Sequence, residues 1–459
     1  MKTIRELSGT DQKQIAIPAT GKNADETEEN SVYELQIFKL NFALLTYSGL
    51  WIPESSSKLS KILYNVFPLL QLTHMAITIG SQVIAMVIYW GNMRVITYTL
   101  GTTMGCVITC CDYINFMYRK RTVLEMVHHM KTEFIAKMRP KYRKLLDSTE
   151  REAKFLTILR VVLAVLAITS AGLLPIINKD ASAVDIDFKN MTTEQIITEK
   201  LVLVMYIPFE FRESPQYEMT FLYQILSASM MVFSSQSVDL LLMILMSLLA
   251  ARFKILGKLL DEMNENISED KINYEDYILP DDFSAHSSNF EGIPDETALT
   301  GDKDDPFRLY LVDCIRQHES AIQFTYKLNN VVSIAGMLQM INIPIMMCAT
   351  GYQVTQGLNI NEFCKFLTLL VLIMYKLFVY CWFGQDVLDQ SEAVQTSLYG
   401  TDWYKLKNSY KSLIPTMLMR ATRAVKLRNG VFNELHFASY SAVLNTAYSY
   451  IALLRQFNE

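Results

Sequence analysis

Charge is scarce in this sequence. Only 19% of its 459 residues are charged, whereas 51% are hydrophobic and the mean hydropathy is +0.16; a soluble protein carries about 25% charged residues. The shortage is concentrated in seven nearly uncharged stretches, each long enough for a helix to cross about 30 Å of hydrocarbon. These stretches are Ile62–Tyr89, Val95–Tyr118, Phe155–Ile177, Met219–Ala251, Val331–Tyr352, Phe363–Phe383 and Phe437–Leu454. The sequence therefore argues against a soluble multidomain enzyme and predicts an all-α membrane protein with seven transmembrane helices.

Other absences narrow the class of protein further. The net charge of −5 leaves no basic field for nucleic acid, and the seven cysteines lie mostly inside the apolar stretches, unlike a secreted disulfide framework. The first thirty residues are polar, so we expect no cleavable signal peptide. There is no Gly-rich phosphate loop and no nucleophile elbow, and none of the six histidines has a partner at metal-ligand spacing within a stretch. We therefore expect no catalytic site, no cofactor and no metal.

The distribution of basic residues predicts how the helices are oriented. If the N-terminus is cytoplasmic, the cytoplasmic segments hold 33 of the 42 lysines and arginines, and the external segments hold six. Because cytoplasmic loops carry the excess of basic residues, we expect a cytoplasmic N-terminus and an extracellular C-terminus, the reverse of a receptor that couples to G proteins. The sequon at Asn190 then lies in the external loop 178–218, where glycosylation is possible.

The segments outside the apolar stretches differ in character. The range 264–306 holds 13 acidic residues, which predicts a disordered cytoplasmic loop, and it lacks the ligand spacing of an EF-hand. Arg119–Glu152 and Phe307–Leu328 are charged but keep a helical apolar period, so we expect them to extend the transmembrane helices into the cytoplasm. Val32–Trp51 is amphipathic but too short and too charged to be an eighth span. The resulting divisions of the chain are 1–58, 59–263, 264–306, 307–383, 384–436 and 437–459.

Four ionisable residues lie inside the apolar stretches: Asp112, Arg160, Asp239 and Lys376. Such residues are costly in lipid and usually face protein or water. Two acids and two bases at a similar depth indicate pairing with one another, either as a belt of ion pairs that orients the helices or as a proton relay.

Two further features of the apolar stretches leave alternatives open. Cys348 and Cys364 lie near the external ends of the fifth and sixth helices, where they are either joined by a disulfide or free. In the seventh stretch, polar side chains recur at helical spacing, among them Thr446, Ser449 and Gln456. A polar face on a transmembrane helix either bonds to neighbouring helices or lines water.

Several short motifs resemble the insect odorant receptor family. They are concentrated in the last eighty residues, with weaker matches near the N-terminus and before the fourth helix. The matching residues are Gly49–Pro53, Pro208-Phe209, Tyr223-Gln224, Tyr380–Gln385, Ser391, Tyr399, Trp403-Tyr404, Met419-Arg420, Lys426-Leu427, Ala447–Tyr450 and Leu453–Arg455.

The resemblance implies an architecture. Members of that family have seven transmembrane helices, a cytoplasmic N-terminus and a re-entrant segment before the first helix, which corresponds to Val32–Trp51. They assemble as tetramers around one pore lined by the seventh helix, and cytoplasmic helices together with the segment before the seventh form an intersubunit anchor. Similarity to the family's pore helix places Leu453, Gln456 and Phe457 at the gate, with Thr446 and Ser449 as the wetted lining below it.

The resemblance also implies a ligand site in the outer halves of the second, third, fourth and sixth helices. A volatile ligand calls for a closed, aromatic-rich cavity with one or two polar groups. Each candidate either contacts the odorant or packs one helix on another. The candidates are Tyr98, Thr102, Ile168, Gly172, Phe221, Tyr223, Leu372 and Tyr375.

The function implied is that of a subunit of an odorant-gated, non-selective cation channel in the plasma membrane of olfactory sensory neurons. Its expected partners are an olfactory co-receptor in a heterotetramer, a small volatile odorant, membrane lipid and permeating cations. The chain does not resemble the co-receptor itself, because its residues just before Phe383 and after Arg455 differ from those of the co-receptor. The alternatives are a gustatory receptor channel of the same superfamily and a seven-helix transporter, which would show internal repeats that are not visible here.

Overall fold

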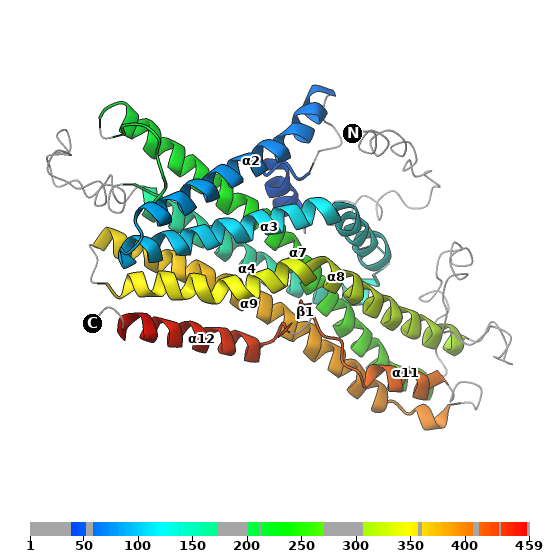
Figure 1. Ribbon diagram of the computed structural model, residues 1–459. Coiled ribbons are helices and arrows are strands. Elements are labelled where there is room, and N and C mark those ends of the chain that lie inside the picture. Colours follow the sequence, from blue (N-terminus) through cyan, green and yellow to red (C-terminus); the bar gives the residue numbers. More distant parts are fainter. Residues whose placement is uncertain are drawn as a thin grey trace, which may run out of the picture.

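The protein is a bundle of long helices, described by a computed structural model (Figure 1). The structure describes residues 38–51, 58–136, 138–172, 201–211, 213–269, 306–356, 360–406, 413–430 and 433–456. The long helices are α2 (Lys58–Ile88), α3 (Met93–His129), α4 (Pro140–Gly172), α7 (Gln216–Glu269), α8 (Pro306–Val354), α9 (Ile360–Tyr399) and α12 (Phe437–Gln456). The short elements are the π-helical turn η1 (Met130–Ile135), the 3-10 turn η7 (Trp403–Lys405), α11 (Leu413–Ala421), and the two-residue strands β1 (Arg428–Asn429) and β2 (Asn433–Glu434), which pair antiparallel.

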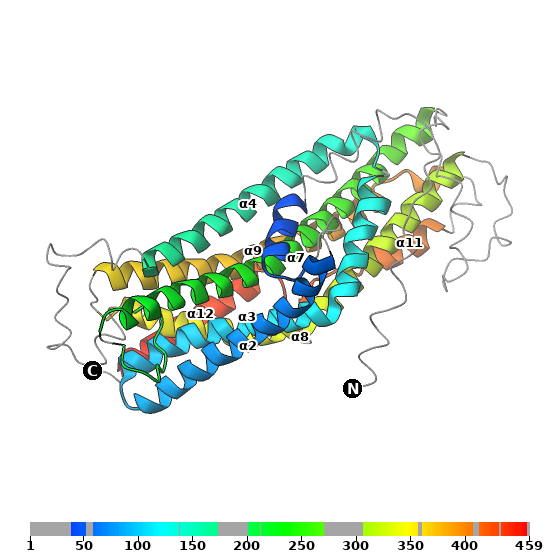
Figure 2. The same ribbon diagram turned by 90° about the horizontal axis from the view of Figure 1, so that it is seen from above.

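The helices run roughly side by side between two ends of the bundle (Figures 1 and 2). At the end that we call the C-terminal end, α2 turns into α3, α8 is followed by α9, and α12 finishes. At the opposite end, the α11 end, α7 finishes and α8 begins beside α11. The turn into α3 is defined by Gly91, whose φ is 97°, and by Asn92, whose side-chain oxygen accepts the Val95 N–H at 3.2 Å as an N-cap.

The helix α7 is the centre of the bundle. In its most apolar window 94% of the residues are buried, compared with 28% for α2 and for α4. A helix that is apolar on all sides must be surrounded by others, whereas one that is apolar yet exposed must face lipid. The composition of α7 thus fits its place inside the bundle, and that of α2 and α4 fits the periphery.

A short helical segment, residues 38–47, lies against the middle of the bundle (Figure 2). Its buried residues Phe38, Asn41 and Leu45 share one helical face, and the Asn41 amide donates to the Leu240 carbonyl of α7 at 3.2 Å. Beyond it, the Tyr113 hydroxyl of α3 donates to the Ser48 carbonyl at 2.8 Å. These bonds attach the amphipathic stretch predicted over Val32–Trp51 to α3 and α7.

Each predicted transmembrane stretch falls within a described helix, apart from terminal residues such as 173–177, which lie outside the described part. Within the described ranges, four helices are long and apolar enough to cross a membrane, and a fifth is added if Tyr310–Ser333 and Gly336–Val354, which meet at 52°, count as one bent span. The helices α3 and α12 do not reach that level by composition. Both carry many hydroxyl groups and other polar side chains, which bond within the bundle or face away from it.

Two helices extend past predicted boundaries. The acidic loop is predicted over 264–306, and α7 continues to Glu269; the part of the loop from 270 to 305 lies outside the described residues. The sixth transmembrane stretch is predicted over Phe363–Phe383, and α9 continues to Tyr399. In both places charged and polar residues follow an apolar stretch without a helix-breaking proline, so the membrane boundary does not end the helix. The predicted glycosylation site Asn190 also lies outside the described residues.

Candidate functional site

A separate aromatic cluster lies at the C-terminal end of the bundle. Its buried members come from α2, α3, the segment 201–211 and α9, and Phe221 of α7 packs against them while partly buried. The buried members are Ala85, Val95, Tyr98, Leu201, Val204, Phe211 and Phe366. It is apolar, aromatic and assembled from several elements, as small-molecule sites are.

Tyr98 is the most strongly held member of this cluster. Its hydroxyl donates to the Val202 carbonyl at 2.6 Å, and its ring meets that of Phe366 edge to face, with centroids 5.0 Å apart. The Lys365 ammonium lies 4.6 Å from the centroid of the Tyr98 ring and donates to the Leu201 carbonyl at 3.3 Å. A cation over an aromatic face is attracted by the ring quadrupole, so Lys365 fixes the ring from one side.

Gln224 holds the segment 201–211 in place against α7. Its side-chain oxygen accepts the N–H groups of Val202 and Leu203 at 2.9 and 3.1 Å, and its amide donates to the Leu203 carbonyl at 3.0 Å. No motif or spacing predicted Leu201, Val204 or Phe366 at this site. The apolar run from Leu201 to Met205, inside a predicted external loop, was the one signal that could have indicated it.

The other residues predicted to bind ligand are spread more widely. Thr102 accepts from the Gln82 amide at 3.2 Å, a Cβ on Gly172 would lie 3.0 Å from Ile225 of α7, and the Tyr375 hydroxyl donates to the Leu156 carbonyl at 2.8 Å. Tyr223 is 42% exposed and meets the ring of His74. Ile168 and Leu372 are half-buried. The structure thus unites Tyr98 and Phe221 in one cluster, whereas Gly172 and Tyr375 contact neighbouring helices.

The four charged residues inside the apolar stretches form one buried network in the middle of the bundle. Asp239 of α7 pairs with Arg160 of α4 and, at 2.9 Å, with Lys376 of α9. The same lysine lies 3.4 Å from Asp112 of α3. Arg160 and Asp239 are almost completely buried, at 2% and 0% side-chain exposure. We call this set, Asp112, Arg160, Asp239 and Lys376, the charged network.

Uncharged residues donate further hydrogen bonds to the two acids of the charged network, among them Ser235 to Asp239 at 3.3 Å, whereas Arg160 Nε has no hydrogen-bond partner among the described residues. The Tyr380 hydroxyl donates to Asp239 at 2.7 Å, and the Gln339 amide donates to both carboxylate oxygens of Asp112 at 2.9 Å. Buried charges are tolerated when they are paired and their remaining lone pairs are satisfied. The network therefore ties α3, α4, α7, α8 and α9 together at one level.

The last helix, α12, is buried on one side only. Ala447 is its one buried residue among those described, and Ile451 fills the space left by Gly351 of α8. The predicted pore residues Thr446, Ser449, Leu453 and Gln456 are all exposed. The hydroxyls of Thr446 and Ser449 donate to backbone carbonyls four residues earlier, so they bond within their own helix rather than to a neighbour. Phe457 lies outside the described residues.

All seven cysteines are free, including Cys348 and Cys364. Among the described residues no group of histidine, cysteine and acidic side chains has the geometry of a metal site.

A family model, individual relatives and solved structures of odorant or olfactory receptors match this chain. Residues 92–448 match the family model described as 7tm Odorant receptor. Odorant receptor 85b of Drosophila melanogaster is 28% identical over 159 residues, which are 34% of this chain and 40% of that receptor. Odorant receptor 83a of the same species is 24% identical over 277 residues, 56% of this chain and 60% of that receptor. The matched regions thus span less than two thirds of these relatives.

Among solved structures, the insect olfactory receptor OR5 from Machilis hrabei in complex with eugenol is similar, with a TM-score of 0.74. The match covers 93% of this chain and 100% of that one at 15% sequence identity, a level at which the likeness concerns the fold.

Proposed function

The chain belongs to the 7tm odorant receptor family, and we propose that it is an odour-tuning subunit of a ligand-gated, non-selective cation channel. In this proposal it assembles with an olfactory co-receptor into a heterotetramer in the plasma membrane of olfactory sensory neurons. Its N-terminus is cytoplasmic, so the C-terminal end of the bundle faces outward. The charge distribution of the sequence supports this orientation, because 33 of 42 basic residues fall in the segments that it assigns to the cytoplasm.

The proposal of a channel rests on the exposed face of α12. Thr446, Ser449 and Gln456 are exposed on a helix whose other side packs against α8 and α9. In a membrane such a face needs water or another subunit beside it. Four copies of this face around one axis would enclose a wetted path, with Leu453 narrowing it close to the end of the helix.

We place the odorant beside Tyr98 and Phe221. The aromatic cluster provides apolar surface. The Lys365 ammonium, which contacts the Tyr98 ring, and the Tyr98 hydroxyl are the polar groups that would orient a ligand. A pocket with few polar groups in an apolar wall is typical for a small, mostly apolar molecule. The remaining predicted residues, Thr102, Ile168, Gly172, Tyr223, Leu372 and Tyr375, stay candidates for the same site.

Patch-clamp recording tests the proposed function. The chain is expressed with and without an insect co-receptor, and a panel of volatiles is applied. We expect odorant-evoked cation current only when both subunits are present. Current from this chain alone would indicate a gustatory-type channel, and silence despite surface expression of both subunits would contradict the proposal.

The odorant site is tested in the same recordings. Tyr98→Phe and Phe221→Ala should change the rank order of effective odorants while current persists. Tyr404→Phe is the matched control, because Tyr404 is 57% exposed and lies in η7, which follows the end of α9 opposite to Phe366. An unchanged ranking in both cluster variants would place the odorant elsewhere.

A further inference from the structure

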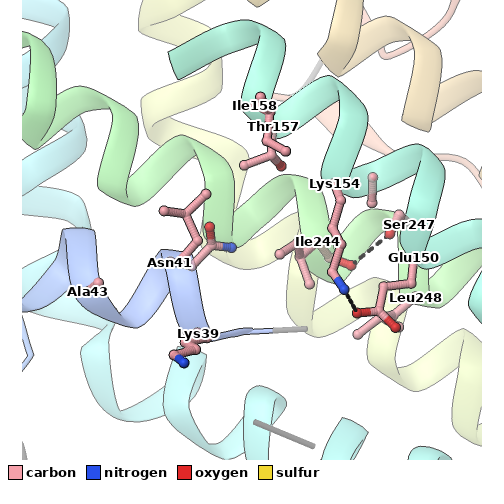
Figure 3. A pocket seen from close by; sticks show the side chains of 12 residues that line it. Lys39, Asn41, Ala43, Glu150, Lys154, Thr157, Ile158, Ile244, Ser247 and Leu248 are labelled. Carbon is pink, nitrogen blue, oxygen red and sulfur yellow. Dashed lines mark hydrogen bonds and ion pairs between the residues drawn. The ribbon is translucent and has the colours of Figure 1, made fainter. Parts of the chain in front are cut away.

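A cavity of about 470 Å³ lies between the segment 38–47, α4 and α7, and shares no lining residue with the aromatic cluster or the charged network (Figure 3). Its walls are predominantly apolar, with Leu40 and Ala43 from the segment, Ile158 from α4, and Ile244 and Leu248 from α7. Its size falls in the range of about 300–1,000 Å³ found for small-molecule sites. It is thus large enough for a ligand and is not part of the site described above.

The mouth of the cavity opens onto a surface that faces lipid. Leu40 is 44% exposed and Ile158 is 56% exposed, although both line the cavity. Ile158 continues an exposed stripe on α4 that includes Phe155, Val162 and Leu166 at helical spacing. Such a stripe on a helix apolar enough to span the membrane lies in hydrocarbon. A ligand therefore reaches this cavity from the membrane rather than from water.

The polar rim of the cavity lies at the boundary of the apolar stretch. Glu150 and Lys154 of α4 form an ion pair there (Figure 3), immediately before Phe155, where the predicted transmembrane stretch begins. This pair satisfies its own charges. A ligand with a polar end would place that end near this rim and its apolar body further along α4.

Two buried oxygens of lining residues accept no hydrogen bond within the described residues: Glu150 Oε1, which is ion-paired with Lys154, and Asn41 Oδ1, which has no ion pair. Asn41 is 1% exposed, and its amide nitrogen donates to the Leu240 carbonyl at 3.2 Å, which fixes the orientation of the side chain. Its oxygen Oδ1 is buried and accepts no bond within the described residues. A buried acceptor of this kind is normally satisfied. The cavity therefore offers one acceptor to a ligand that brings one donor.

We propose that this cavity binds a membrane sterol, whose hydroxyl donates to Asn41 Oδ1. A sterol combines a rigid apolar body with a single hydroxyl at one end, which matches a predominantly apolar cavity with one acceptor, Asn41 Oδ1, that has neither a hydrogen bond nor an ion pair. Its fused rings lie along Ile158 and its tail follows the exposed stripe of α4. A phosphatidylcholine would bring a phosphate for Lys39, which also lines the cavity, but its headgroup has no hydrogen-bond donor for Asn41 Oδ1, and a small volatile alcohol would leave the stripe uncovered.

The test measures binding directly and is independent of channel activity. The purified full-length chain in phosphatidylcholine nanodiscs is labelled with a cholestanol probe that carries a diazirine on its second ring. We expect the label on residues 38–47 or 150–158, and we expect cholesterol to compete for labelling at about a three- to tenfold lower concentration than cholestenone, a ketone that cannot donate. Equal competition by the ketone, label confined to other segments, or stronger competition by octanol than by cholesterol would each overturn the sterol site.

Substitutions inside and outside the cavity test whether Asn41 causes the preference for cholesterol. Asn41→Leu should remove the preference for cholesterol over cholestenone. Asn115→Leu is the matched control, since Asn115 also donates to a carbonyl of another helix, that of Val331 at 2.9 Å, but lies outside the cavity. Ala43→Trp should abolish labelling by filling the cavity from an exposed position. Because the two competitors are compared on the unmodified chain, a variant that fails to fold leaves the central result intact, whereas a folded Ala43→Trp protein that labels normally contradicts the proposal.

Discussion

Lys376 is the residue on which the charged network depends. Its ammonium lies 2.9 Å from Asp239 and 3.4 Å from Asp112, so it connects α9 to both α7 and α3. The sequence indicated that the four charges would pair, since unpaired charges are costly in lipid. It could not indicate that one lysine would bridge both acids, or that Tyr380 and Gln339 would donate to them, because those partners lie far away in the chain.

Asp239→Asn should destabilise the chain strongly. The change leaves Arg160 and Lys376 buried with one carboxylate fewer, and breaking a buried pair costs about 3–5 kcal/mol. The measurement is thermal unfolding of the detergent-purified protein, together with surface expression. Asp402→Asn is the control, because the Asp402–Lys405 pair lies near the surface, with 35% and 55% side-chain exposure. Equal thermal stability of the two variants would show that the charged network contributes little to the stability of the fold.

His129, in the part of α3 beyond the predicted transmembrane stretch, should make stability depend on pH. Burial, followed by the nearby Arg252 guanidinium and opposed by Glu133, lowers the pKa of His129 to about 4 from an ordinary value of 6.5. Between these values the unfolded chain binds a proton that the folded chain does not, so stability falls as the pH drops from about 6.5 toward 4.

Thermal midpoints measured across this pH range check the effect. His129→Gln should reduce the dependence but not abolish it, because burial also lowers the pKa of His318 to about 4, whereas His128→Gln, at the exposed neighbouring position, should leave it in place. An unaltered pH profile in the His129 variant would assign the dependence to other groups.

At the scale of elements, the position of α12 depends on a close backbone contact before it begins. A Cβ on Gly384 of α9 would lie 2.2 Å from the backbone oxygen of Leu435. No side-chain rotation relieves such a contact, so the chain leading into α12 approaches α9 only because residue 384 is glycine.

Gly384→Ala should displace the start of α12 and reduce odorant-evoked current, with a loss of stability of about 1–3 kcal/mol from overpacking. Gly257→Ala provides the comparison, since a Cβ there would lie at an ordinary 3.6 Å from the Ser397 hydroxyl. Current amplitude and thermal midpoint are measured for both. If the Gly384→Ala and Gly257→Ala channels have equal currents and equal thermal midpoints, the close contact at Gly384 does not determine the position of α12.

Periodicity and hydropathy predicted the existence and order of the long helices, because each apolar stretch is a local property of the chain. They did not predict where α7 and α9 end, since helical propensity continues past the last apolar residue. The aromatic cluster was predicted only through Tyr98 and Phe221. Leu201 and Phe366 join it through contacts across more than a hundred residues, which no local pattern records.

At the scale of the whole molecule, the proposed orientation rests on the distribution of basic residues. A tag before Met1 should be protected from antibody in intact cells, and a tag after Glu459 should be accessible. Permeabilised cells provide the control for tag recognition. An accessible N-terminal tag in intact cells would reverse the proposed orientation, and with it the placement of the aromatic cluster on the outside.

The central proposal is that α12 lines a pore that opens when odorant binds. Leu453 is 49% exposed on the face that carries Ser449 and Thr446, whereas Ala447 is 2% exposed against its own chain. Cysteine is introduced at 453, at 457 or, as the control, at 447, and each variant is co-expressed with the co-receptor.

A charged thiol reagent is then applied externally during odorant-evoked current. We predict block at 453 and 457 that is faster when odorant holds the channel open, and no block at 447. Indifference to the reagent at both 453 and 457, with surface expression confirmed, would contradict the assignment of α12 as the pore helix.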